Sequence, residues 1–129
     1  MSRRRIVRLV TLALLLPPTA PALPAFAAAQ PAAVGQCVRT TIRMKGSRLE
    51  GMPDSGDALA YANGIVGISY DRVSGLRTAR AGDPVKLCLT SLPQNCPPGD
   101  DRGKTYKATD LRTHKSWELP DAEHMCGGA

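Results

Sequence analysis

The four cysteines, at positions 37, 88, 96 and 126, are the residues with the clearest chemistry in this 129-residue sequence. Zinc sites use thiolates in pairs two to four residues apart, whereas these cysteines are separated by 51, 8 and 30 residues. In an exported domain, an even number of cysteines at such spacings indicates disulfides. We therefore expect two disulfides, no metal site and no other cofactor.

Four cysteines allow three pairings, and the sequence alone does not choose among them. Proximity in the sequence favours a bridge between Cys88 and Cys96, which leaves Cys37 to pair with Cys126. Loop-closure entropy would then contribute roughly 2.5 kcal/mol for the short loop and roughly 4.5 kcal/mol for the long one. The second value is comparable to the whole net stability of a small domain. We expect the fold to depend on these bridges.

A serine and two histidines are the candidates for catalysis. Asp54, Ser55 and Gly56 match the Asp-Ser-Gly around the nucleophile of trypsin-like proteases, but the flanking glycines of that motif are missing. A serine nucleophile also needs a base that a third group orients. His114 and His124 are the only histidines, and both follow predicted turns late in the chain. The tripeptide at 54–56 is therefore expected to form an Asx-type turn. A small hydrolase that uses His114 or His124 with an aspartate is the alternative to a non-enzymatic function.

A stripe of cations is the first candidate for a binding surface. If the first strand is regular, one of its faces presents Arg39, Arg43 and Lys45, and Arg48 follows. These side chains would meet phosphate groups of the envelope or an acidic protein. The alternative is a solvated strand face that its charges protect against edge-to-edge pairing.

The polar segment Met52–Asp57 is the second candidate. An inhibitor-like protein would present a polar loop to its target, and Asp54, Ser55 and Asp57 lie in the loop that suits this role best. With no nucleophile motif beside a base, the sequence favours a non-enzymatic binding module of the bacterial envelope. Its partner would be a protein or an anionic envelope polymer.

The first 29 residues have the pattern of a secretory signal peptide. Four arginines precede an apolar run of eight residues at 9–16, two prolines end the run, and cleavage is expected after Ala27 or Ala29. A membrane anchor would need about 20 apolar residues. The arginines fit either the general or the twin-arginine export route. We expect a periplasmic or secreted protein without a membrane span in its mature form, with a disordered leader at 30–36.

Length and charge exclude several classes of protein. A chain of 129 residues holds one domain, expected at 37–129, and is too short for a multidomain enzyme or a nucleotide-binding α/β fold. The formal net charge is +6, but 13 cations and 11 acids remain once residues 1–30 are removed. A mature charge of +2 argues against a nucleic-acid partner.

Strand patterns dominate the mature sequence. Residues 38–45 and 85–90 alternate between apolar and polar side chains, and Asn63-Gly64 between two apolar runs predicts a hairpin with a type I′ turn. A second hairpin is predicted for 105–109 and 116–119, with Trp117 and Leu119 on one buried face. Loops are expected at 46–57, 71–82 and 97–103. These patterns predict a mainly β fold, a small antiparallel barrel or sandwich of about six short strands with two disulfides.

Several short motifs share one further property. Asp-Asp-Arg-Gly at 100–103, Ser-Trp-x-Leu-Pro-Asp at 116–121 and the ending His-Met-Cys-Gly-Gly-Ala at 124–129 resemble a family of small uncharacterised secreted bacterial proteins. The segments 61–64, 69–71 and 82–88 fit the same pattern. The resemblance covers nearly all of the mature chain and implies a single domain with two disulfides. It implies no activity and no catalytic residues.

Overall fold

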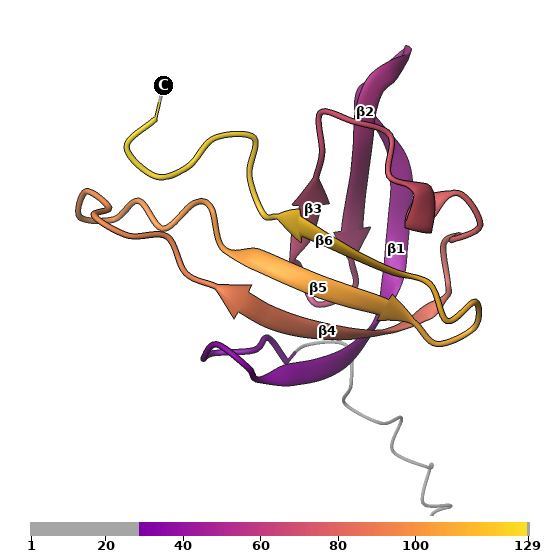
Figure 1. Ribbon diagram of the computed structural model, residues 1–129, viewed down its shortest axis with the longest axis horizontal. Helices are drawn as coiled ribbons and strands as arrows, with labels where there is room; N and C mark the ends of the chain where they lie inside the picture. The colour runs from indigo at the N-terminus through magenta and orange to yellow at the C-terminus, as the bar shows by residue number, and fades with distance from the viewer. Residues whose placement is uncertain (1–28, 129) are drawn as a thin grey trace, which may run out of the picture.

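Six strands and one short 3-10 helix make up the computed structural model, which describes residues 29–128 (Figure 1). They are β1 (Cys37–Leu49), β2 (Met52–Tyr61), β3 (Val66–Ile68), η1 (Ser74–Leu76), β4 (Pro84–Ser91), β5 (Thr105–Asp110) and β6 (Ser116–Pro120). The strands form one antiparallel sheet in the order β3-β2-β1-β4-β5-β6. The predicted mainly β class with six strands is confirmed.

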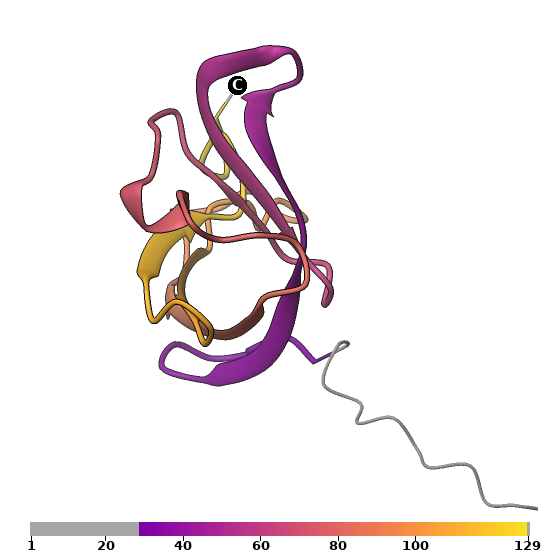
Figure 2. The ribbon, with the colours of Figure 1, turned by 90° about the vertical axis from the view of Figure 1, so that its right-hand side faces the viewer.

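The sheet is open but strongly curled, as Figure 2 shows for β4, β5 and β6. Its edge strands β3 and β6 lie close to each other but do not pair. A Cβ built on Gly67 of β3 would lie only 3.1 Å from Cδ1 of Leu119 on β6. A closed barrel, one of the two predicted architectures, is therefore not formed. Residues 1–28 of the predicted signal peptide lie outside the described part of the chain. No helix between residues 29 and 128 has the length and apolar character needed to cross a membrane.

The concave side of the sheet holds the core. The alternation in β4 buries Val85, Leu87 and Leu89, whose exposed fractions are 0%, 0% and 1%, so the prediction that these residues share one face is confirmed. Trp117 is buried as predicted, and its Nε1–H donates a hydrogen bond of 2.9 Å to the Tyr61 hydroxyl. This bond joins β6 to β2 across the interior. Burial raises the pKa of Tyr61 to about 12.

The predicted loop at 46–57 is wrong, because β1 and β2 continue through it as a hairpin that projects from the sheet (Figures 1 and 2). The strands meet at Glu50 and Gly51. Between the pairs Ser47–Asp57 and Leu49–Met52, β1 has one residue and β2 has four. Such a bulge accommodates a Pro- and Gly-containing sequence that a regular strand would exclude. The composition of this segment therefore concealed a strand.

A second irregularity breaks the predicted cationic stripe. The register of β1 against β2 shifts between Ile42 and Met44, so Arg43 is an extra residue. Inserting one residue exchanges the faces of all the side chains that follow. Met44 is consequently 58% exposed, although the alternation predicts it on the apolar face. Lys45 turns to the concave side, away from the face that carries Arg39.

The predicted hairpin at Asn63-Gly64 forms between β2 and β3, but its turn is not type I′. Tyr61 N–H bonds Ile65 C=O and Gly64 N–H bonds Tyr61 C=O, which gives a three-residue loop. In this loop Gly64 alone has a positive φ, of 88°. The Asn63 side chain instead binds backbone, with Oδ1 accepting from Ile65 N–H and Nδ2 donating to Ala29 C=O.

The predicted disulfide pairing is wrong. The bridges are Cys37–Cys88 and Cys96–Cys126. Cys37 and Cys88 are directly opposite each other on β1 and β4, so pairing within the sheet brings them together. Cys96 follows the end of β4 in a loop that leads away from Cys88, toward the C-terminal segment. Separation by eight residues in the sequence therefore did not mean proximity in space.

The segment 30–36, for which the sequence predicts a disordered leader, contacts the domain in the structure. Pro31 is buried, and the Gln30 side chain donates a hydrogen bond to Asn63 C=O. Gly35 N–H bonds Leu89 C=O, and Leu89 N–H bonds Gln36 C=O. These last two bonds extend the pairing of β1 with β4 toward the N-terminus.

Candidate functional site

An open cleft of about 510 Å³ lies between the β1–β2 hairpin and the segment 72–77 that contains η1. The hairpin contributes strand residues from both of its arms, and the segment contributes the opposite wall. The lining residues are Lys45, Gly46, Ser47, Pro53, Asp57, Arg72, Val73, Leu76 and Arg77.

Contacts of Asp57 fix the segment over the hairpin. Asp57 Oδ2 accepts a hydrogen bond of 2.7 Å from Val73 N–H, and Oδ1 lies 3.5 Å from Arg72 Nε. Arg72 Nη1 also donates to Pro53 C=O at 2.8 Å. Leu76, the last residue of η1, is buried and anchors the segment in the core. The wall of the cleft is thus held by both polar and apolar contacts.

Gly56 makes this geometry possible. Its φ of +106° belongs to the region that glycine alone adopts readily, and a Cβ at this position would lie 2.0 Å from Ser69 C=O. The close approach lets Asp57 exchange both backbone hydrogen bonds with Ser69. The Asp57 carboxylate is thereby directed at the segment 72–77.

The cleft carries more positive than negative charge. Lys45, Arg72 and Arg77 line it, together with Asp57, the single carboxylate that the described residues contribute. Lys45 Nζ donates to Leu76 C=O at 2.8 Å, and Arg72 is partly neutralised by Asp57. Arg77 forms no ion pair with any of residues 29–128. An anion entering the cleft would meet cations from two of its walls.

Two of the predicted binding residues, Lys45 and Asp57, line this cleft. The others lie elsewhere. Arg39 is exposed on the convex face opposite Lys86, and Arg43 occupies the bulge in β1. Asp54 is exposed on the hairpin arm.

Arg48 and Ser55, also predicted to bind a partner, have structural roles in the hairpin. Arg48 Nε donates to Ser55 C=O, and its guanidinium lies 4.2 Å from the centre of the Tyr70 ring. Ser55 Oγ accepts from Leu49 N–H and donates to Met52 C=O, which closes the bulge. Both side chains stabilise the arm that carries Asp57.

Sequence reasoning missed Arg72 and Arg77. Both lie in the segment 71–82, which has no strand or helix pattern and was predicted only as a loop. The available signal was charge, because this segment contains three arginines within twelve residues. A local pattern does not show that such a loop folds back over a hairpin more than fifteen residues earlier.

The histidines of the alternative hydrolase do not assemble with a carboxylate. His114 has a φ of 60° in the turn between β5 and β6, and His124 lies in the C-terminal segment. Neither lines the cleft. Within the described part of the chain, no hydrogen bond joins either imidazole to an aspartate or glutamate. Asp110, next to the His114 turn, is fully buried and accepts hydrogen bonds from Arg112 N–H and Thr113 N–H.

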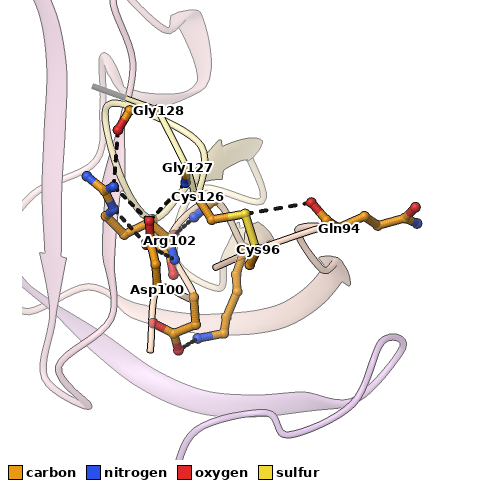
Figure 3. A network of polar contacts seen from close by, with 11 residues as sticks. Gln94, Cys96, Asp100, Arg102, Cys126, Gly127 and Gly128 are labelled. Atoms are coloured by element: carbon orange, nitrogen blue, oxygen red, sulfur yellow. Dashed lines mark hydrogen bonds and ion pairs between the residues drawn. A yellow bond between two sulfur atoms is a disulfide. The ribbon is translucent and has the colours of Figure 1, made fainter. Parts of the chain in front are cut away.

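A second polar cluster, which we term the C-terminal clasp, joins residues 94–103 to residues 121–128 (Figure 3). Asp100 accepts hydrogen bonds of 2.8 Å from Nε and Nη2 of Arg102 and one of 2.9 Å from Gly127 N–H. Arg102 also donates to Gly128 C=O, and the Cys96–Cys126 disulfide crosses the same two segments. The Arg102 guanidinium and the Gly127 N–H hold the pKa of Asp100 well below its usual range.

The charged motif residues at 100–102 have structural partners in and beside the clasp. Asp100 binds Arg102, Asp101 binds Lys104, and Asp121 accepts a hydrogen bond from Gly103 N–H. Among residues 29–128, no group of three or more histidine, cysteine or acidic side chains is placed to hold a metal ion. No family model, curated protein or solved structure matches the chain. Function is therefore inferred from the geometry of the cleft.

Proposed function

We propose that this chain is an exported, non-enzymatic binding module whose cleft binds an acidic group of a protein or of an anionic envelope polymer. The observation that carries the proposal is the convergence of Lys45, Arg72 and Arg77 around a cleft with one carboxylate. The two disulfides support export, because such bonds persist mainly outside the cytosol. The separation of both histidines from the cleft favours binding over hydrolysis.

The cleft suits an acidic group in size and in charge. A volume of about 510 Å³ falls within the range of ordinary ligand sites. Neighbouring cations repel one another, and a carboxylate or phosphate between them relieves that repulsion and accepts charge-assisted hydrogen bonds. Val73 and Leu76 add apolar surface beside the cations. This combination fits one acidic group of a larger partner.

Removal of one cation from the cleft tests the proposal. Arg77→Gln deletes the charge that has no ion-pair partner among residues 29–128, and Arg39→Gln deletes an equal charge on the convex face, outside the cleft. Fluorescence anisotropy with labelled poly-L-glutamate would measure the affinity of each variant. We expect Arg77→Gln to weaken binding by roughly tenfold, the value of one charge-assisted hydrogen bond, and Arg39→Gln to weaken it by about twofold or less. Equal losses in both variants, or no binding by the unaltered protein, would contradict the proposal.

A further inference from the structure

We infer that the partner is a protein that presents an extended, acidic peptide segment, which adds as a strand to the free edge of β1 and places its acidic side chains in the cleft. This inference rests on the proposed function, because it assigns an occupant to the same cleft. Three features carry it: an unpaired strand edge, side chains that do not protect this edge, and a difference in chemistry between its two faces.

The projecting half of β1 has a partner on one side only. β4 pairs with β1 from Cys37 to Thr41, and the contact ends where Ile42 exchanges backbone hydrogen bonds with Asp83 and Gly82. Beyond the bulge at Arg43, β1 pairs with β2 alone among the described residues. Within the described part of the chain, the opposite edge of this half-strand is therefore free along the hairpin.

The register shows which backbone groups point to the free edge. Asp57 exchanges its hydrogen bonds with Ser69 on the β3 side, so it does not bond its β1 neighbour Ser47. In an antiparallel pair, bonded and non-bonded positions alternate. The N–H and C=O groups of Ser47 and Lys45 consequently point away from β2. Neither residue has a backbone partner within residues 29–128.

The side chains along this edge leave the backbone accessible. Exposed strand edges are normally protected by charged side chains, by proline or by covering segments. Here the Lys45 side chain is bonded to Leu76 C=O, and the next two residues, Gly46 and Ser47, are small. All three line the open cleft. An incoming peptide would thus reach the unpaired N–H and C=O groups directly.

The two faces of the β1 edge favour different side chains on the incoming peptide, so acidic and apolar residues should alternate along it. A residue opposite Lys45 or Ser47 would exchange both backbone hydrogen bonds with it and point its side chain to the same face, into the cleft with Arg72 and Arg77. The residue between them would point to the other face, where Met44 is 58% exposed. The preferred segment therefore alternates acidic and apolar residues, as in strand addition to other sheet edges.

The first experiment removes one donor from the free edge. Ser47→Pro deletes the N–H that points away from β2 and leaves the β1–β2 ladder intact, whereas the matched control Ser47→Ala removes the hydroxyl and keeps the N–H. The probe is a labelled, end-blocked peptide Val-Glu-Val-Glu-Val, with affinity measured by fluorescence anisotropy. We expect Ser47→Pro to weaken binding by about tenfold and Ser47→Ala by no more than about twofold. Equal affinities of the two variants would overturn the inference.

A second probe separates strand addition from charge recognition. Methylating the backbone nitrogens of both glutamates keeps the charges and removes the donors that would bond Lys45 and Ser47. The methylated peptide should bind the unaltered protein at least about tenfold more weakly, with no further loss in Ser47→Pro. If it binds as well as the parent peptide, the inference fails while the proposed function stands. If neither peptide nor poly-L-glutamate binds, the proposed function fails as well.

Hydrogen exchange tests the same inference without a substitution. The amides of Lys45 and Ser47 should become protected when the parent peptide saturates the unaltered protein, and their unchanged exchange would overturn the inference. Sedimentation of the free protein gives a further check. A dimer that Ser47→Pro dissociates and Ser47→Ala does not would show that a second copy of the chain, and not an acidic peptide, occupies the edge.

Discussion

The cleft and the C-terminal clasp both place arginines beside aspartates, but they differ in how completely those charges are matched. In the clasp, Arg102 and Asp100 bind each other and the backbone of the last residues. In the cleft, Asp57 faces three cations, and Arg77 has no ion-pair partner among the described residues. The backbone beside the cleft is also unmatched, since the edge of β1 at Lys45 and Ser47 has no pairing partner within residues 29–128.

This difference distinguishes a structural site, the clasp, from a candidate binding site, the cleft, within one small domain. A polar network that satisfies its own members holds two segments together, as the clasp does with its disulfide. A group of cations without matching acids contributes little to stability and attracts an anion. The sequence motifs at 100–103 and 124–128 lie in the first kind of site. The proposed binding site uses residues that no motif marks.

Among changes within these two regions, the largest effect should come from the disulfide of the clasp. Replacing Cys96 and Cys126 with alanine releases a loop of 30 residues, worth about 3.5 kcal/mol of loop-closure entropy. We expect the melting temperature, measured by circular dichroism, to fall by roughly 15 °C or more. Affinity for poly-L-glutamate, measured well below that temperature, should stay unchanged. Loss of binding in the folded variant would show that the two regions are not independent.

Gly56→Ala should affect stability and binding together. The substitution places a Cβ 2.0 Å from Ser69 C=O at a φ of +106°, and we expect a loss of roughly 2–3 kcal/mol in unfolding free energy. Gly51→Ala is the matched control, since its φ is +75° and no atom lies within 4 Å of the added Cβ. It should cost about 1 kcal/mol and leave binding intact. Chemical denaturation and anisotropy would measure the two quantities, and intact binding by folded Gly56→Ala would contradict the assignment of the cleft.

Acid should loosen the clasp through Asp100. Its pKa is lowered in the folded protein, chiefly by Arg102, so its stabilising contribution is complete above the ordinary aspartate pKa of about 3.9 and is lost as the pH falls below that value. The amide resonance of Gly127, which donates to Asp100, should therefore titrate with a midpoint below about 3.9. Asp100→Asn should abolish this titration. A midpoint at the ordinary value would show that the carboxylate is not held in the clasp.

The smallest effect should come from Glu123, which connects the two regions. Its carboxylate lies 3.1 Å from Arg48 on the hairpin, and its exposed side chain limits the strength of this ion pair. Glu123→Gln should change the free energy of unfolding by less than about 1 kcal/mol. Thermal unfolding measures this change, and a larger destabilisation would indicate that the clasp supports the hairpin.

The elements predicted correctly are those whose patterns are local. The alternation of Val85, Leu87 and Leu89 fixed the buried face of β4, and the polar turn before Ser116 located the hairpin of β5 and β6. The β1–β2 hairpin was missed because glycine, proline and serine form bulges as well as loops. Neither the bulge at Arg43 nor the true partner of Cys37 has a local signal, since both depend on how distant strands align.

The candidate site was predicted only in part for the same reason. Lys45 and Asp57 were identified from a cationic stripe and a polar loop, neither of which exists in the structure as predicted. Their proximity to Arg72 and Arg77 arises because Asp57 binds Val73 N–H, a contact between segments sixteen residues apart. Positive charge in the segment 71–82 was visible, but its position over the hairpin follows only from the fold.

The bond between Trp117 and Tyr61 provides an intrinsic optical reporter. Trp117 is the only tryptophan in the chain, so its emission comes from one known place. Its indole is buried, bonded to the Tyr61 hydroxyl, and lies beside Gly75 of η1, in the segment that forms one wall of the cleft. A shift of the emission to longer wavelength therefore registers separation of β6 from β2 and from that wall. Unfolding can thus be followed without a label on the protein, in the same sample in which a labelled peptide reports binding.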